Sequence, residues 1–119
     1  MDTAVMAANV EAQLNGAWAE SDESCKNAFV VKGGKWDFRE PRDMFGSSYI
    51  ISGRRYEGPF GVCNLTSIKP KGDKLLLSLS YHNSIGYSDQ VTPIHLTSST
   101  EMVVFSMDDM AINYKKCGR

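Results

Sequence analysis

The chain has 119 residues, which is enough for one domain and too few for two ordinary ones. Hydrophobic residues make up 42% of the chain and charged residues 23%, a composition typical of a globular protein and not of a disordered one. The net charge of −1 excludes a strongly basic protein of the nucleic-acid-binding kind, and no apolar run approaches the ~20 residues that span a bilayer.

The first 13 residues predict a short helix or a flexible arm. They are rich in alanine, valine, methionine, glutamate and glutamine, which tolerate or favour a helix, but the apolar positions form no single stripe. A charged region followed by an apolar one is missing, so we expect no intact signal peptide here. The remaining residues, 14–119, are expected to form one domain.

Turn residues divide the first half of that domain into short strand-like pieces. Residues 14–20 form the first piece, and residues 28–31 and 36–40 flank two adjacent glycines, which predict a hairpin. Residues 49–56 are predicted as one strand, in which Gly53 marks a bulge or a close backbone approach.

The second half contains five more strand-like pieces: residues 60–68, 74–82, 87–96, 101–107 and 110–114. The piece 74–82 alternates best, because leucines and Tyr81 face one side and polar residues the other. Pro93 fits an edge, a bulge or a bend and not a central ladder. A meander this long removes its edges only by closing, so the pattern predicts an all-β, antiparallel up-and-down barrel. We expect its core to contain the large apolar residues Trp18, Trp36, Phe38, Leu75, Leu77, Leu79, Val104, Ile112 and Tyr114.

The opening Gly16-x-Trp18, the meander and the cysteines near both ends resemble the calycins, the group of lipocalins and similar small barrels. In that group the glycine lets the first strand bend and the tryptophan packs across the closed end. The chain is closer still to small exported bacterial proteins with the pattern G-x-W … C … Y-x-x-C, whose positions are occupied by Gly16, Trp18, Cys25, Tyr114 and Cys117. The resemblance implies a lipocalin-like barrel of about eight strands in a periplasmic or secreted protein. The interior holds either a ligand cavity or only the barrel's own side chains.

Three cysteines leave the disulfide pairing open. In a closed meander the first and last strands are neighbours, so Cys25 and Cys117 can reach the Cα separation of ~4.4–6.8 Å that a disulfide needs. Cys63 would then be a buried free thiol, and Cys25 with Cys63 is the competing pairing. One disulfide favours an exported protein and three thiols a cytoplasmic one. With no C-x-x-C pair, we expect no zinc or redox site and no cofactor.

No catalytic constellation is evident, so we expect a non-enzymatic protein. Ser84, His82 and Asp89 are close in sequence, but they belong to one predicted hairpin turn and no nucleophile elbow accompanies them. His82 and His95 lack the close spacing of a metal site.

The candidate ligand-binding residues are Arg54, Tyr56, Tyr81 and Tyr87. Strand alternation puts Arg54 and Arg55 on opposite faces, so one of them either points inward, where it could hold an anion, or packs over an apolar surface. We therefore expect a monomer or weak homodimer that binds a small hydrophobic or anionic ligand, or a protein partner. The alternative is a periplasmic protease inhibitor acting through its N-terminal arm, as in a family of bacterial metalloprotease inhibitors that shares the small-barrel design.

Overall fold

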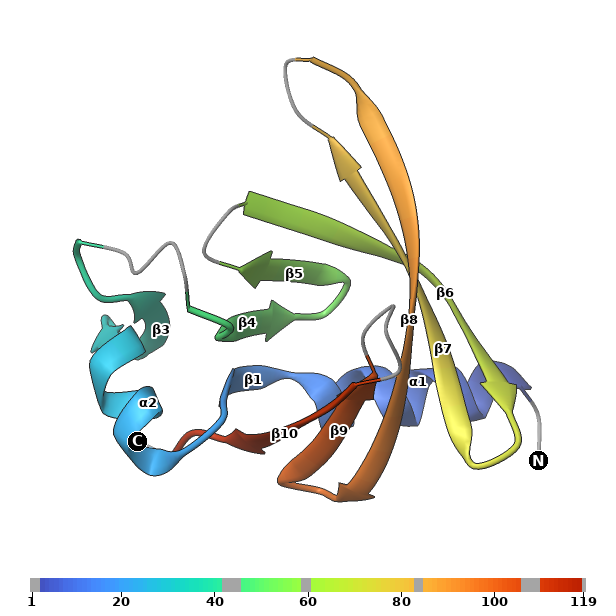
Figure 1. Cartoon of the computed structure of the whole chain (residues 1–119), viewed down its shortest axis with the longest axis horizontal. Coiled ribbons are helices and arrows are strands. Elements are labelled where there is room, and N and C mark those ends of the chain that lie inside the picture. Colours follow the sequence, from blue (N-terminus) through green and yellow to red (C-terminus); the bar gives the residue numbers. More distant parts are fainter. Residues whose placement is uncertain (1–2, 42–45, 59–60, 83–84, 106–109, 119) are drawn as a thin grey trace.

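The computed structural model describes residues 3–41, 46–58, 61–82, 85–105 and 110–118. In these residues the chain forms two helices and ten strands (Figure 1). Their bounds are α1 Thr3–Leu14, β1 Gly16–Ala19, α2 Asp22–Ala28, β2 Phe29–Lys32, β3 Lys35–Phe38, β4 Tyr49–Ser52, β5 Arg55–Gly58, β6 Gly61–Lys71, β7 Lys74–His82, β8 Tyr87–Ser98, β9 Glu101–Phe105 and β10 Ala111–Lys116.

Eight of the strands form a closed antiparallel barrel in the order β1-β10-β9-β8-β7-β6-β5-β4. The first and last strands of the chain are neighbours, with Trp18 opposite Lys116, and β1 closes the ring by pairing with β4, with Ala17 opposite Ile50. The predicted antiparallel up-and-down barrel is therefore confirmed. Tyr114 of β10 also contacts the segment before β4, the other neighbour of β1, because its hydroxyl donates a 2.8 Å hydrogen bond to the Ser47 carbonyl.

Helix α1 closes one end of the barrel. Leu14 is fully buried, and its carbonyl accepts a 2.8 Å hydrogen bond from the indole Nε1 of Trp18, which is also 0% exposed. The Lys116 ammonium donates to the carbonyl of Gln13 at 2.6 Å and lies 5.2 Å from the Trp18 ring. These bonds satisfy carbonyl groups that the last turn of a helix leaves unpaired. Gly16 permits this packing, because a Cβ at its φ of +138° would lie 3.2 Å from the Lys116 side chain.

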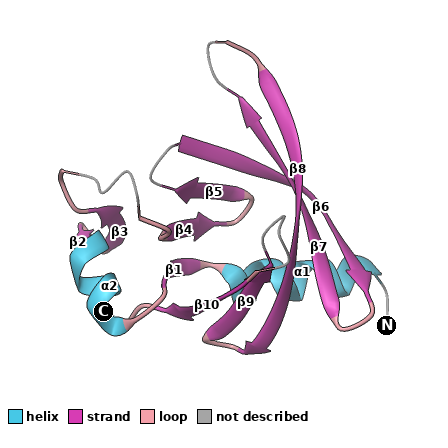
Figure 2. Cartoon of the chain, in the orientation of Figure 1, coloured by secondary structure: helices cyan, strands magenta, loops and turns pink. Residues whose placement is uncertain are grey.

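A second layer covers the outside of β1 and β4. It consists of α2 and the β2–β3 hairpin, which form a unit beside the barrel (Figure 2). Phe29 and Phe38 pack there with Ala17, Ala19 and other residues whose side chains face away from Trp18. The expectation that this hairpin belongs to the barrel was wrong, as was the placement of Trp36 and Phe38 in the barrel core.

Helix α2 was not predicted, although its start carries a recognisable signal. Ser21 is the N-cap, and its hydroxyl accepts a 3.0 Å hydrogen bond from the Ser24 amide. Asp22 and Glu23 follow in the first turn, where carboxylates interact favourably with the helix dipole.

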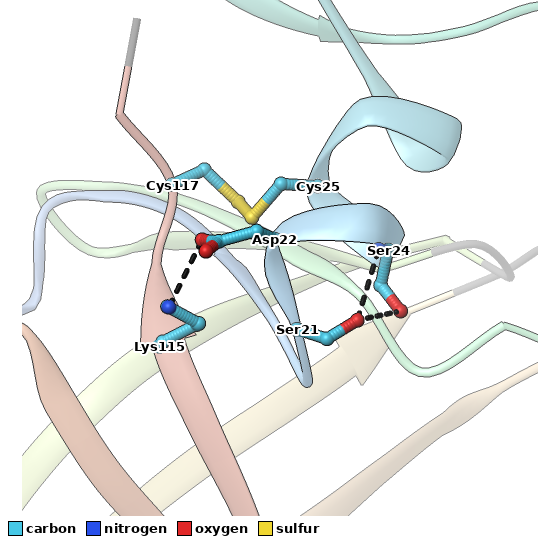
Figure 3. The surroundings of a disulfide bond; sticks show 6 residues. All are labelled: Ser21, Asp22, Ser24, Cys25, Lys115 and Cys117. Carbon is cyan, nitrogen blue, oxygen red and sulfur yellow. Dashed lines mark hydrogen bonds and ion pairs between the residues drawn. A yellow bond between two sulfur atoms is a disulfide. The ribbon is translucent and has the colours of Figure 1, made fainter.

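A disulfide between Cys25 and Cys117 ties α2 to the end of β10, with a Cα–Cα separation of 5.7 Å (Figure 3). This settles the pairing against the Cys25–Cys63 alternative, and Cys63 is a free thiol. Beside the disulfide, Lys115 Nζ lies 2.9 Å from the Asp22 carboxylate.

Residues 49–56 are two strands and not one. The chain reverses between β4 and β5 through Gly53, whose φ of +60° suits a glycine in a tight turn. The Gly53 amide donates a 2.6 Å hydrogen bond to the Asn15 side chain, which holds the turn against the end of α1.

The expected edge or bend at Pro93 takes the form of an edge. Pro93 pairs with Leu76 of β7, while the pairing of β8 with β9 begins only at Ile94. Among the described residues β8 therefore has one neighbour at Pro93, where the missing amide removes no bond to β9.

Candidate functional site

The barrel encloses a cavity of about 670 Å³. Leu14 of α1 forms part of its floor, and side chains from β4 to β10 form its walls. A cavity of this size settles one open question, because the interior is not filled by the barrel's own side chains.

The inner part of the cavity is apolar. Alternate residues of each strand point inward, as expected for a barrel. The buried members of this lining, all 9% exposed or less, are Leu14, Ile51, Tyr56, Leu77, Ile94, Met102 and Val104.

The outer part of the cavity carries polar side chains, mainly from β8. Ser88 and Gln90 line the cavity and are exposed, so they lie at its mouth. Thr92 lies one step further in, and its hydroxyl accepts a 3.1 Å hydrogen bond from the Gln90 amide. This polar wall is absent from the sequence prediction, although Ser88, Gln90 and Thr92 share the alternation, and hence the face, of the apolar Ile94.

No lysine, arginine, aspartate or glutamate lies among the described residues of the cavity lining. A charged ligand would therefore find no ion-pair partner in that lining. Transferring an unpaired charge into such surroundings is costly, whereas an uncharged molecule loses little.

Three residues with chemically distinctive side chains form a row across the cavity wall. Tyr56 of β5 pairs with Cys63 of β6, and Cys63 pairs with Tyr81 of β7. All three line the cavity. The Tyr81 ring lies against Gly61, where a Cβ would come within 2.9 Å of it, so the glycine makes room for the ring.

Burial favours the neutral form of Tyr56 and of Cys63, the first two members of this row. It raises the pKa of the Tyr56 hydroxyl, and the negative charge of Glu11 raises it further. Burial also raises the pKa of the Cys63 thiol, so less of it is thiolate at neutral pH than in an exposed cysteine.

Of the four predicted ligand-binding residues, the structure brings Tyr56 and Tyr81 to the cavity and leaves the other two outside it. Tyr87 is 63% exposed, packs against His82 in a tilted arrangement with ring centroids 5.1 Å apart, and donates a 2.8 Å hydrogen bond to Asp89.

Arg54 lies in the β4–β5 turn, where it contacts Glu11 at 2.9 Å and has a side chain that is 58% exposed. The side chain of Arg55 is 56% exposed and pairs with Glu57. Neither arginine points into the cavity, because the continuous strand that the alternation argument assumed is interrupted by the turn at Gly53.

The histidines lie in separate surroundings. His82 Nε2 is 3.3 Å from the Ser80 hydroxyl, whereas Asp89 bonds to Tyr87. His95 Nδ1 is 2.7 Å from the Asp73 carbonyl, and Ser84 lies outside the described residues. Within the described part of the chain, no three or more histidine, cysteine, aspartate or glutamate side chains gather as a metal site would require.

Comparison of the chain with protein-family models, with curated proteins and with solved structures finds no match. The closed eight-stranded antiparallel barrel is consistent with a calycin-like fold. Among the described residues no helix is long and apolar enough to cross a membrane.

Proposed function

We propose that the protein is a non-enzymatic carrier or receptor that holds a small, largely apolar and uncharged molecule inside its barrel. The single observation that supports this is the cavity of about 670 Å³ with its apolar inner part and its uncharged described lining. Binding sites for small molecules typically have volumes of about 300–1,000 Å³, with mainly apolar walls and a few polar groups. The absence of an arginine in that lining favours the hydrophobic ligand over the anionic one.

We further propose that the protein works in the periplasm or outside the cell. The disulfide supports this, because such bonds persist in oxidising compartments and are rare where glutathione and thioredoxin keep thiols reduced. The bond joins α2 to β10 and lies away from the cavity lining, so its role there would be to hold the outer layer on the barrel.

The test uses N-phenyl-1-naphthylamine, an uncharged probe that fluoresces when it leaves water for an apolar site. We expect saturable fluorescence with one probe per chain. The reactivity of Cys63 shows whether the probe binds in the cavity, because Cys63 lines the cavity and is the one cysteine outside the disulfide. Bound probe should slow its alkylation by N-ethylmaleimide.

A matched pair of variants on β8 makes the test specific. Thr92 lines the cavity, whereas its neighbour Val91 points away from it and is 57% exposed. Thr92→Trp should weaken probe binding at least about tenfold by occupying the cavity, and Val91→Trp should leave it unchanged. Equal binding by both variants, or no binding by the unaltered protein, would contradict the proposed function.

A further inference from the structure

The hydroxyl of Tyr56 is a buried polar group without a partner among the described residues. Tyr56 as a whole is only 8% exposed. Buried hydroxyl groups in folded proteins almost always form a hydrogen bond, because leaving one unpaired forfeits the bonds it made to water. One unsatisfied hydroxyl therefore lies in the wall of the apolar inner part of the cavity, where it can serve as a hydrogen-bond donor.

Tyr56 faces the cavity near its floor. Its partners on the neighbouring strands, Ile51 and Cys63, both line the cavity, as does Tyr56 itself. Arg54, two residues before it, contacts Glu11 of α1 at 2.9 Å, so this part of the chain lies beside the helix. The phenol is thus placed on the inner side of the cavity, far along the path of an entering molecule.

The same surroundings determine what the hydroxyl can recognise. Burial and the negative charge of Glu11 oppose its ionisation, so it keeps its proton and can donate it to an acceptor. An anionic acceptor would be repelled by Glu11, and the counter-ion of Glu11 is the exposed Arg54 of the turn, outside the cavity lining. A neutral acceptor is not repelled by Glu11 and needs no positively charged partner in the cavity lining.

We propose that Tyr56 is the inner hydrogen-bond donor of the binding site and that its ligand carries a neutral carbonyl oxygen on the end that enters first. This inference rests on the proposed function, because it assigns an orientation and a chemical class to the molecule in the cavity. The apolar body of the ligand lies against the inner walls. Its outer end reaches Ser88 and Gln90, where polar groups are tolerated.

Two compounds of nearly equal shape test the donor: 2-acetylnaphthalene and 2-ethylnaphthalene, which differ by a carbonyl group in place of a methylene group. Each is titrated against bound N-phenyl-1-naphthylamine, and the ratio of their dissociation constants is compared between variants. Tyr56→Phe should shift this ratio toward the hydrocarbon by about threefold to tenfold, the range that a net hydrogen bond supplies. The dissociation constant of the hydrocarbon should stay unchanged.

The matched control is Tyr81→Phe, which removes a hydroxyl from the same cavity row two strands away. It should leave the ratio unchanged. The carbonyl stretching frequency of bound 2-acetylnaphthalene provides a second measurement. It should be lower in the unaltered protein and in Tyr81→Phe than in Tyr56→Phe, because a hydrogen bond weakens the carbonyl bond.

The thermal midpoint of the ligand-free protein separates the proposal from a structural explanation. Removing an unpaired hydroxyl should leave the midpoint of Tyr56→Phe equal or raise it. A lowered midpoint together with an unchanged ratio would assign the hydroxyl to a structural water and overturn the inference. The same holds if Tyr81→Phe, and not Tyr56→Phe, shifts the ratio. Failure of the naphthylamine to bind at all would instead refute the proposed function.

Discussion

Replacing Cys25 and Cys117 together by alanine should remove a large part of the stability of the protein. The two residues are 92 positions apart in the sequence. In the chain-entropy model, a cross-link that closes a loop of this length restricts the unfolded chain by about 4.6 kcal/mol at 25 °C. Domains of this size unfold with a free energy of about 5–15 kcal/mol, so the double variant would be marginally stable.

Urea denaturation with two fluorescence reporters can measure this loss. Trp18 lies in the barrel floor and Trp36 in the outer hairpin, so Trp36→Phe leaves a reporter of the barrel and Trp18→Phe a reporter of the outer layer. If the disulfide acts through the unfolded chain, both reporters should show the same lowered free energy of unfolding.

The reasoning would be refuted if the barrel reporter lost less than about 1 kcal/mol while the outer-layer reporter lost much more, because the disulfide would then only pin α2 locally. Cys63→Ala is the control, since Cys63 forms no disulfide and is partly exposed in the cavity wall. It should change the free energy of unfolding by about 1 kcal/mol or less.

Three further predictions concern the floor, the thiol and the N-terminal segment. Trp18→Ala should cost about 3–5 kcal/mol in urea denaturation, because it empties a fully buried site at the closed end; an unchanged midpoint would argue against the barrel core described above. Cys63 should react with iodoacetamide more slowly than an exposed cysteine at pH 7 and faster as the pH rises, because burial raises its pKa; a rate equal to that of a free cysteine would contradict this. If the protein instead inhibits a protease through its N-terminal arm, deleting residues 1–8 should abolish inhibition while the fold persists, since the buried Val10 and Leu14 remain; inhibition that survives the deletion would exclude that mechanism.

The features that could be predicted from the sequence are those that depend on neighbouring residues. The alternation in residues 74–82 corresponds to β7, and the glycines at positions 33–34 and 72 correspond to two hairpin turns. The disulfide was also predictable, because closing a meander places its first and last strands together whatever the details of the loops.

The features that could not be predicted depend on distant contacts. Gly53 suits a bulge as well as a turn, and what holds the turn is a hydrogen bond to Asn15, 38 positions away. Arg54 does not line the cavity, because this turn interrupts the strand that was expected to carry it. Likewise, the alternation around Trp36 predicts that one face of the hairpin is buried. It does not predict which part of the protein covers that face. Here the cover is the outside of the barrel, where small alanines leave room for it.

The closure of the barrel has a consequence for how the protein folds. Strand β1 is complete after the first residues of the domain, yet one of its two partners is β10, the last strand of the chain. Contacts between such distant segments form slowly, because the intervening chain must first lose much of its freedom. A chain still emerging from the ribosome, or still crossing a membrane, presents the unpaired edges of β1 and β9 to its surroundings until β10 arrives. During this interval it should depend on chaperones to avoid pairing with other chains, and the speed of its completion should govern the yield of folded protein.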